Sequence, residues 1–249
     1  MLQARQLTKH FTDKKRGTVR AVDGVDLECK AGEIFGLLGL NGAGKTTTLR
    51  LLATILRADS GSVMIDGVDA QVHPEKVRSK IGFLTGSTGL YLRLTPREIL
   101  AYFGQLAGLD NATIARRSDD LIARLGMKEF ADSRVDKLSS GQKQRTSIAR
   151  TLIHDPPLLI LDEPTIGLDV VTSRAIVEFI REARTRGKCV LLSTHIMHEA
   201  AKLCDRIAIL HAGRVRRVGT LADFRTQYGH DDLDDIFVAA IEGNGGMAQ

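Results

Sequence analysis

Short apolar runs separated by glycines and polar turns fill the first third of the chain and predict β-strands. Residues 22–29 alternate apolar and polar positions, and residues 34–38 form a continuous run that ends at a glycine-rich segment. Leucine and isoleucine then recur at helical spacing, which predicts a helix over residues 46–56. A third apolar run meets Asp66-Gly67, a pair typical of a tight turn.

The pattern becomes helical between residues 91 and 137. The segment Thr95-Pro96-Arg97-Glu98 matches a capping box with proline at the first helical position, so a helix is expected to begin there. A second helix is predicted over residues 114–125. We expect the buried stripe of the first helix to consist of Leu100, Phe103, Leu106 and Ala107.

Strands and helices alternate again after that helical segment. Residues 158–161 are all apolar, as expected for a strand buried on both faces of a parallel sheet. A helix is predicted over residues 172–186, a buried strand over 190–192 and a closing hairpin over 207–218. The predicted architecture is an α/β protein whose mostly parallel core is split by a helical segment.

The composition indicates a folded protein that stays outside the bilayer. The 249 residues carry 35 Lys+Arg against 30 Asp+Glu, and 43% are hydrophobic, which excludes disordered and fibrous classes. Three cysteines match no zinc or disulfide framework and suit a reducing compartment. No secretory signal is visible, and no stretch reaches the about 20 apolar residues that span a bilayer. We therefore expect a cytoplasmic protein. The basic runs 14–16 and 214–217 fit either solvated faces or a surface that contacts phosphate or lipid.

Residues 39–46 match the phosphate-loop pattern G-x-x-x-x-G-K-[ST]. The glycines let backbone N–H groups point at phosphate oxygens, the helix that follows adds its positive dipole end, and Lys45 adds a charge. The Thr46 hydroxyl is placed to ligate Mg²⁺. The rival dinucleotide pattern fails because Thr47 stands where its third glycine would be. The candidate nucleotide-binding residues are Gly39, Leu40, Asn41, Gly42, Ala43, Gly44, Lys45, Thr46 and Thr47.

Two carboxylates, Asp162 and Glu163, follow the apolar run 158–161 directly. Ligands of α/β sheets bind at the carboxyl ends of the strands, where these side chains are expected. Asp162 is a candidate Mg²⁺ ligand, and Glu163 is a candidate to orient or deprotonate an attacking water.

Residues 138–142, Leu-Ser-Ser-Gly-Gln, allow two interpretations. Serine followed three residues later by glutamine is a capping box, so the segment is expected to begin a helix. A helix N-terminus with exposed hydroxyls is also an anion site. Ser139, Ser140, Gly141 and Gln142 are therefore candidate ligands for a second nucleotide.

The phosphate loop, the Leu-Ser-Ser-Gly-Gln segment and Leu-Leu-Ile-Leu-Asp-Glu-Pro, in this order, resemble the ATP-binding subunit of ABC (ATP-binding-cassette) transporters. Ser140 replaces the first glycine of the usual Leu-Ser-Gly-Gly-Gln signature. The resemblance covers nearly the whole chain and implies a P-loop NTPase cassette with an N-terminal antiparallel β part. Its implied organisation is a core over residues 1–91 and 138–220, a helical subdomain over 92–137 and a C-terminal tail over 221–249.

The same resemblance implies ATP and Mg²⁺ as cofactors and two classes of partner. A second copy would pair head-to-tail, so that ATP lies between the phosphate loop of one copy and Ser139–Gln142 of the other. An integral membrane permease would receive the motion at the cytoplasmic face of the membrane, and no nucleic acid is expected.

Further residues match the family one by one. Phe11 resembles the aromatic that stacks on adenine, and an ordinary core position is its alternative. His195, after a buried strand, resembles the histidine that contacts the γ-phosphate, which makes it a second catalytic candidate beside Glu163. The loop 167–169 resembles the segment through which paired copies sense each other, with Ile166 where many relatives have serine.

One position departs from the family and two segments indicate a branch. Gly86 stands where most relatives have a glutamine that ligates Mg²⁺, so coordination would rest on Thr46, Asp162, phosphates and water. Residues 85–91 resemble the sodium-exporter branch. Residues 231–237 resemble the tail of subunits that serve exporters, or else form a solvated acidic segment.

These observations favour the ATPase motor of an ABC exporter, with sodium ions or drugs as the cargo classes that the resemblance suggests. Two alternatives stay open at this point. A non-transport ABC ATPase would act on nucleic acid or ribosomes, and a regulatory sensor would bind ATP without useful turnover.

Overall fold

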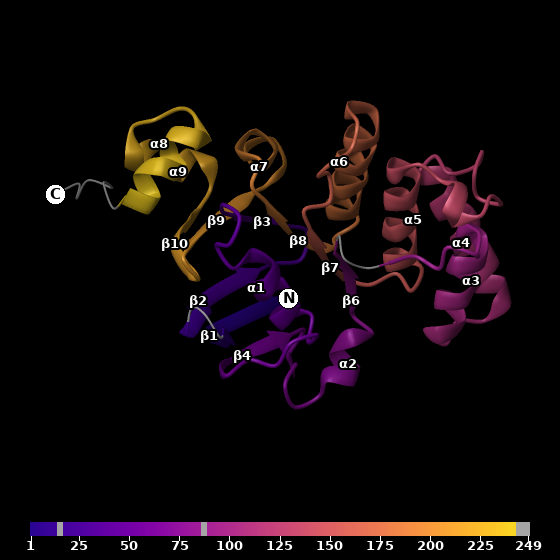
Figure 1. The fold of residues 1–249 in the computed structure, drawn as a ribbon, viewed down its shortest axis with the longest axis horizontal. Coiled ribbons are helices and arrows are strands. Elements are labelled where there is room, and N and C mark those ends of the chain that lie inside the picture. Colours follow the sequence, from indigo (N-terminus) through magenta and orange to yellow (C-terminus); the bar gives the residue numbers. More distant parts are fainter. Residues whose placement is uncertain (14–16, 86–88, 243–249) are drawn as a thin grey trace.

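Two β-sheets lie at the centre of the molecule, with helices above and between them (Figure 1). The computed structural model describes residues 1–13, 17–85 and 89–242. Gly86, which the sequence singled out, lies outside these described residues. The N-terminal antiparallel part that the family resemblance implied is present, and β3 of the mostly parallel sheet lies in the chain between its strands β2 and β4.

The N-terminal sheet is antiparallel, and among the described residues its four strands have the order β2-β1-β4-β5. Its long pair is β1 and β2, and the expected turn at Asp66-Gly67 joins β4 to β5 with both residues at positive φ, 52° and 75°. The strand bounds are β1 Leu2–Asp13, β2 Gly17–Cys29, β4 Ser60–Ile65 and β5 Val68–Asp69.

The second sheet holds six strands of the described chain in the order β10-β9-β3-β8-β7-β6. All neighbours are parallel except the closing hairpin of β9 and β10. The bounds are β3 Ile34–Leu38, β6 Ile81–Leu84, β7 Leu158–Asp162, β8 Cys189–Thr194, β9 Arg206–His211 and β10 Arg214–Gly219.

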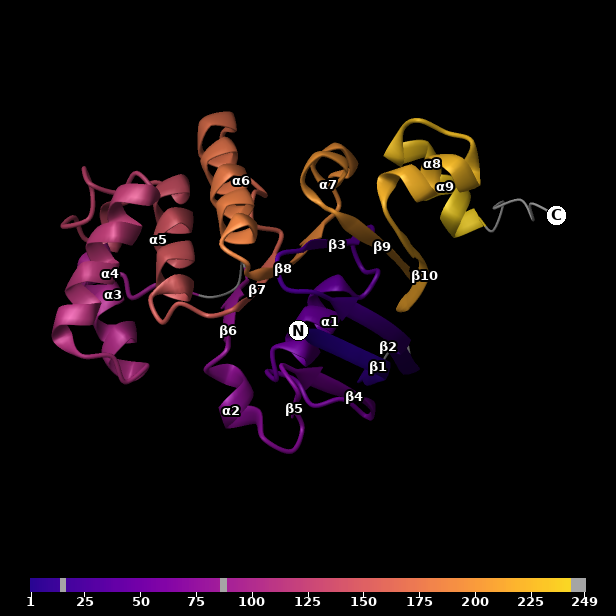
Figure 2. The ribbon, with the colours of Figure 1, turned by 180° about the vertical axis from the view of Figure 1, so that it is seen from behind.

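Both faces of the parallel sheet are buried, which explains the continuous apolar runs of its strands. Alternate residues point to opposite faces, so Leu158 and Ile160 pack toward α1 and the N-terminal sheet. Leu159 and Leu161 pack toward the helices of the other face. Figure 2 shows the same layers from behind, with α1 between the two sheets.

The sequence patterns indicated the places of α1, α3, α4, α5 and α6, with two corrections in detail, and did not indicate those of α2, α7, α8 and α9. Helix α1 is shorter than predicted because it ends at Leu52, after which Thr54 has a φ of 59°. Helix α3 has the expected capping box at Thr95, yet Leu106 is 70% exposed and Ala107 is exposed, so the predicted buried stripe was wrong at that end. The helix bounds are α1 Lys45–Leu52, α2 Pro74–Arg78, α3 Pro96–Leu106, α4 Asn111–Arg124, α5 Ser140–Leu152, α6 Val170–Thr185, α7 Met197–Leu203, α8 Leu221–Tyr228 and α9 Leu233–Glu242, with a 3₁₀ turn at Val135–Lys137.

The segments at the two ends of the long axis are both helical (Figure 1). Helices α3 and α4 lie within residues 92–137 at one end, and α8 and α9 lie at the other, where Phe224 and Phe237 join a core with β9 and α7. The last pair was not predicted as helices. The domain boundaries proposed from the sequence stay predictions. Within the described part of the chain, no helix is long and apolar enough to cross a membrane.

Candidate functional site

The phosphate loop connects β3 to α1 and closely approaches two other strands, β2 and β9. Gly44 has a φ of 104°, and a Cβ there would lie 2.3 Å from the carbonyl oxygen of Ala21 on β2. A Cβ on Gly39 would lie 2.5 Å from the carbonyl oxygen of Leu210 on β9. Glycine is therefore required at both positions. The positive φ and the close contact both require it at Gly44, and the contact alone requires it at Gly39.

Lys45 extends along the inside of this loop and is 5% exposed. Its Nζ donates to the carbonyl oxygens of Gly39 at 2.8 Å and Leu40 at 3.3 Å. The same Nζ lies 3.3 Å from Oε1 of Glu163. The ammonium group is thus held where loop carbonyls and a carboxylate meet.

Asp162 and Glu163 stand at the carboxyl end of β7, as predicted, and a serine on β8 positions both. Ser193 is fully buried, and its Oγ donates to Oδ1 of Asp162 at 2.6 Å. The backbone N–H of Glu163 donates to Oγ of Ser193 at 3.1 Å and to its carbonyl oxygen at 3.2 Å. Sequence reasoning missed Ser193, although its place two residues before His195 on a buried strand was a usable signal.

Glu163 is in direct contact with the second catalytic candidate. Nδ1 of His195 lies 3.0 Å from Oε1 of Glu163, so the ring nitrogen donates to this carboxylate oxygen. Glu163 also has a φ of 48°, the left-handed region that non-glycine residues seldom occupy. The surrounding hydrogen bonds hold the carboxylate in this conformation, with Lys45 and His195 both beside Oε1.

A cavity of about 660 Å³ opens beside the phosphate loop. It contains most of the predicted loop residues together with both carboxylates. The predicted residues that line it are Asn41, Gly42, Gly44, Lys45, Thr46, Thr47, Asp162 and Glu163, and those that the sequence did not indicate are Val19, Arg20, Ala21, Arg50, Thr85, Ile166 and Ala212. Its charge, shape and backbone donors suit a polyphosphate.

Several predicted residues do not line the cavity. Gly39 and Ala43 are buried in the loop, and Leu40 is 49% exposed beside it. Phe11 is 40% exposed on β1 and pairs with Val19, which lines the cavity, so it stands next to the site. His195 reaches the site through Glu163.

The segment Ser139–Gln142 begins α5 and is not among the residues that line the cavity. Both hydrogen bonds of the predicted capping box are present: Gln142 N donates to Oγ of Ser139 at 3.3 Å, and Ser139 N donates to the Gln142 side chain at 2.9 Å. The prediction that this segment begins a helix is therefore confirmed. An anion bound by the segment would have to be one that does not lie in the cavity of the same chain.

Asp169, in the neighbouring loop, caps α6. The backbone N–H of Thr172 holds the pKa of the Asp169 carboxyl below its usual range.

The oxygen donors of the cavity fit Mg²⁺. Thr46 and Asp162 both line it, and Ser193 fixes the Asp162 carboxylate from behind. Among the described residues there is no group of three or more His, Cys, Asp or Glu side chains that could form a metal cage. One hydroxyl and one carboxylate, completed by phosphate oxygens and water, match the way Mg²⁺ is usually bound in nucleotide sites.

A phosphate loop after the parallel strand β3, with an acidic pair at the end of β7 on the far side of β8 in the same sheet, defines a P-loop nucleotide-binding protein. Residues 22–166 match the family model of the ABC transporter. The ABC transporter ATP-binding protein NatA of Bacillus subtilis (strain 168) is 41% identical over 242 residues, 97% of this chain and 98% of that protein. The daunorubicin resistance ATP-binding protein DrrA3 of Streptomyces coeruleorubidus is 36% identical over 230 residues, covering 92% and 73%.

Solved structures agree with this assignment. An ATP-binding subunit of an ABC transporter superposes with a TM-score of 0.87 at 32% identity, over 97% of this chain and 99% of that one. A dimeric ATP-binding cassette in a post-hydrolysis state with ADP and phosphate has a TM-score of 0.80 at 27% identity, over 88% and 98%. The chain belongs to the ABC transporter family, as an ATP-binding subunit. This confirms the predicted fold and favours the transport interpretation over a nucleic-acid ATPase.

Proposed function

We propose that this chain binds and hydrolyses ATP through Lys45, Glu163 and His195, and that a head-to-tail pair of copies drives a separate membrane permease. The observation that carries the catalytic part is the convergence of His195 Nδ1 and Lys45 Nζ on one oxygen, Oε1 of Glu163, at 3.0 and 3.3 Å. That oxygen lies at the edge of the phosphate cavity.

Glu163 acts as the base in this proposal. Phosphate oxygens that enter the loop compete with Glu163 for the Lys45 ammonium, because both anions attract the same Nζ. Release of that contact leaves the carboxylate to accept a proton from the attacking water while the γ-phosphoryl group passes to the water oxygen. His195 holds the carboxylate by its hydrogen bond and stands near the transferred group.

Thr46 and Asp162 would hold Mg²⁺, which supplies charge neutralisation at the β- and γ-phosphates. Ser193 keeps the Asp162 carboxylate in the orientation that this binding requires. The backbone donors of residues 42–47 hold the remaining phosphate oxygens at the start of α1.

The proposed pairing of two copies rests on the position of Ser139–Gln142, which lies outside the nucleotide cavity of its own chain. Ser139–Gln142 presents a helix N-terminus outside the cavity, so a polyphosphate in that cavity is reached by this segment only from another copy. The dimeric cassette with ADP and phosphate supports such an assembly.

Similarity to NatA, an ABC transporter ATP-binding protein, and to DrrA3, a daunorubicin resistance protein, supports a permease partner at the cytoplasmic face of a membrane. DrrA3 supports a drug as the cargo class, and the resemblance of residues 85–91 to the sodium-exporter branch supports sodium ions. The cargo itself would be selected by the permease.

The test is a comparison of Glu163→Gln and Lys45→Ala with the wild-type chain. Glu163→Gln should bind ATP, form dimers in sedimentation analysis and hydrolyse ATP at least about 100-fold more slowly, because the base is lost while the site stays intact. Lys45→Ala should bind ATP more weakly. Wild-type turnover in Glu163→Gln would refute the assigned base, and unchanged ATP affinity in Lys45→Ala would refute the assigned phosphate contact.

A further inference from the structure

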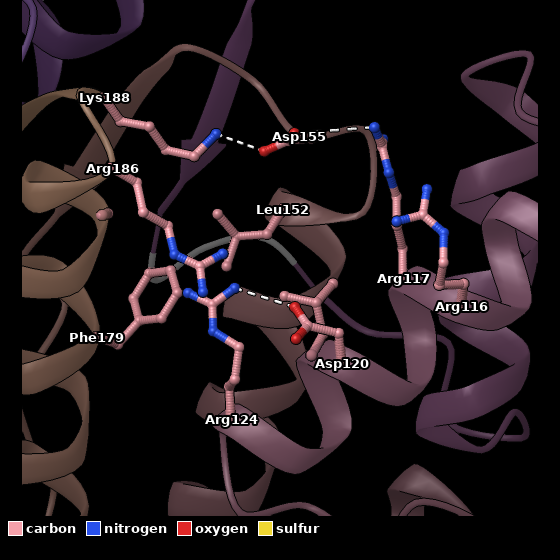
Figure 3. A pocket seen from close by; sticks show the side chains of 11 residues that line it. Arg116, Arg117, Asp120, Arg124, Leu152, Asp155, Phe179, Arg186 and Lys188 are labelled. Atoms are coloured by element: carbon pink, nitrogen blue, oxygen red, sulfur yellow. Dashed lines mark hydrogen bonds and ion pairs between the residues drawn. The ribbon is translucent and has the colours of Figure 1, made fainter.

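A second cavity, of about 480 Å³, lies between α4 and α6 (Figure 3). Asp155 precedes β7 and Lys188 precedes β8, and both line this cavity. The nucleotide cavity contains Asp162 at the other end of β7. The two strands are parallel, so one cavity lies at their amino ends and the other at their carboxyl ends. Nothing in the proposed ATPase chemistry uses the second cavity.

Cationic side chains dominate the lining of the second cavity. Its cations are Arg116, Arg117, Arg124, Arg186 and Lys188. The carboxylates that line or flank it are Asp120, Asp155 and Glu182. Five cations against three carboxylates leave an excess of positive charge inside one concave surface.

Each of two carboxylates is shared by two cations, which leaves guanidinium donors for a further anion. Asp155 accepts from Lys188 Nζ at 2.6 Å, and Arg117 lies 3.8 Å from its other oxygen. Glu182 lies 3.1 Å from Arg124 and 2.7 Å from Arg186 through separate oxygens. An arginine has five N–H donors, so one carboxylate that is shared by two cationic side chains cannot accept hydrogen bonds from all of their donors.

Arg116 differs from the other cations. Figure 3 draws no interaction from Arg116 to the other residues of the cavity, and its side chain is exposed at the rim beside Arg117. Arg186 is half exposed and lies above the ring of Phe179 in the same view. These two arginines therefore reach the cavity from opposite helices, α4 and the end of α6.

The floor of the cavity keeps the charged groups in place. The Arg124 guanidinium lies 5.5 Å from the ring centroid of Phe179, and Leu121 and Leu152 are buried beneath it. Apolar packing restricts Arg124, and the shared carboxylates restrict Arg117 and Arg186, before any ligand arrives, which lowers the entropy lost on binding.

We propose that this cavity binds a phosphate-bearing anion, contacted by Arg116 from α4 and Arg186 from the end of α6. Arginine is the residue best suited to phosphate because its planar fork donates two hydrogen bonds to adjacent oxygens. A phosphate group also matches the local excess of positive charge. A bound anion would join the inserted helical segment to the core, because α4 belongs to the first and α6 to the second.

The test uses tripolyphosphate in isothermal titration calorimetry, with saturating ADP present so that the phosphate loop is already filled. The variant is Arg116→Ala/Arg186→Ala, and the matched control is Arg5→Ala/Arg225→Ala, two exposed arginines of β1 and α8 at a distance from α4. The cavity variant should bind at least about tenfold more weakly than the wild type, and the control should bind as the wild type does. Thermal unfolding without ligand checks that both variants fold.

A third variant moves the affinity in the opposite direction. Asp120 lies 3.1 Å from Arg124 and competes with a ligand for its donors. Asp120→Asn should therefore tighten tripolyphosphate binding severalfold, which a loss of structure would not do. Binding in all cases should weaken as salt concentration rises.

Two sources of phosphate are separated by a second arm of the experiment. Sedimentation with phosphatidylcholine vesicles, with and without phosphatidic acid, reports a lipid head group, and calorimetry reports a free polyphosphate. Loss in the cavity variant and not in the control, in either arm, supports the proposal and identifies the source. Equal behaviour of both variants, or no binding in either arm, would overturn it.

Discussion

Two glycines of the phosphate loop differ in what an added methyl group would meet, and this difference gives a quantitative test of the loop geometry. Gly42 and Gly44 both have positive φ, 82° and 104°. A Cβ on Gly42 would have nothing within 4 Å, whereas one on Gly44 would lie 2.3 Å from the carbonyl oxygen of Ala21. Gly42→Ala therefore measures the conformational effect alone, and Gly44→Ala adds a clash with backbone.

The magnitudes follow from these contacts. An alanine in the left-handed region costs roughly 1–2 kcal/mol, less the stabilisation that comes from restricting the unfolded chain. Gly42→Ala should thus lower the free energy of unfolding by about 1 kcal/mol. Gly44→Ala must also displace β2 from the loop, and overpacking of this kind costs about 1–3 kcal/mol more.

The assay is equilibrium unfolding in urea without nucleotide, followed by circular dichroism for the two variants and the wild type. The reasoning predicts that Gly44→Ala is less stable than Gly42→Ala by more than about 1 kcal/mol. Equal stabilities, or a Gly42→Ala variant that is the less stable one, would refute the described approach of β2 to the loop.

Three further outcomes are expected. Ser193→Ala, which removes the hydrogen bond to Asp162, should lower ATP turnover about 10- to 100-fold and raise the Mg²⁺ concentration needed for half-maximal activity; an unchanged Mg²⁺ dependence would contradict its positioning role. Burial lowers the pKa of His154, against the smaller opposing effect of its hydrogen bond to Ile81 O, so the folded chain binds fewer protons than the unfolded chain below about pH 6.5. The contribution of neutral His154 to the free energy of unfolding is therefore complete above that pH and is lost on acidification. The unfolding temperature of the wild type should drop more than that of His154→Gln between about pH 7.5 and about pH 5.5. Parallel pH curves of the two proteins would contradict this effect of His154. Thr95→Ala, which removes the cap of α3, should lower the free energy of unfolding by about 1 kcal/mol in urea titrations, and a loss below about 0.3 kcal/mol would show that the capping box contributes little.

Features encoded by neighbouring residues could be predicted from the sequence. The phosphate loop, the Asp162-Glu163 pair and the capping box of Ser139 each depend on a short segment, whose residue types determine the turn, the strand end or the helix start. Their joint order along the chain also carried the family resemblance, which the comparisons confirmed.

Features that depend on strand pairing could not be predicted in the same way. Ser193 contacts Asp162 because β7 and β8 pair in a register that only the folded sheet defines. Ala21 lines the cavity because β2 passes the phosphate loop, and no local pattern records that approach. Leu106 continues the helical spacing of the apolar stripe but is exposed, because spacing in the sequence does not show where the helix extends beyond the elements that pack against it.

The C-terminal helices were missed for a related reason. The acidic residues around Leu233 suggested a solvated segment, yet Leu233, Ile236 and Phe237 are buried against β9 and α7. Their apolar spacing is compatible with one helical turn, and the packing partner lies elsewhere in the chain. Tertiary burial therefore decided the structure of this segment.

Purification of Glu163→Gln from detergent-solubilised native membranes, with and without ATP, tests whether this chain is the ATPase subunit of an exporter. The account predicts that a multi-span membrane protein is recovered in constant proportion to this chain. Its sequence would then narrow the cargo. Recovery of nucleic acid or soluble assemblies alone, with no membrane protein in either condition, would contradict the account.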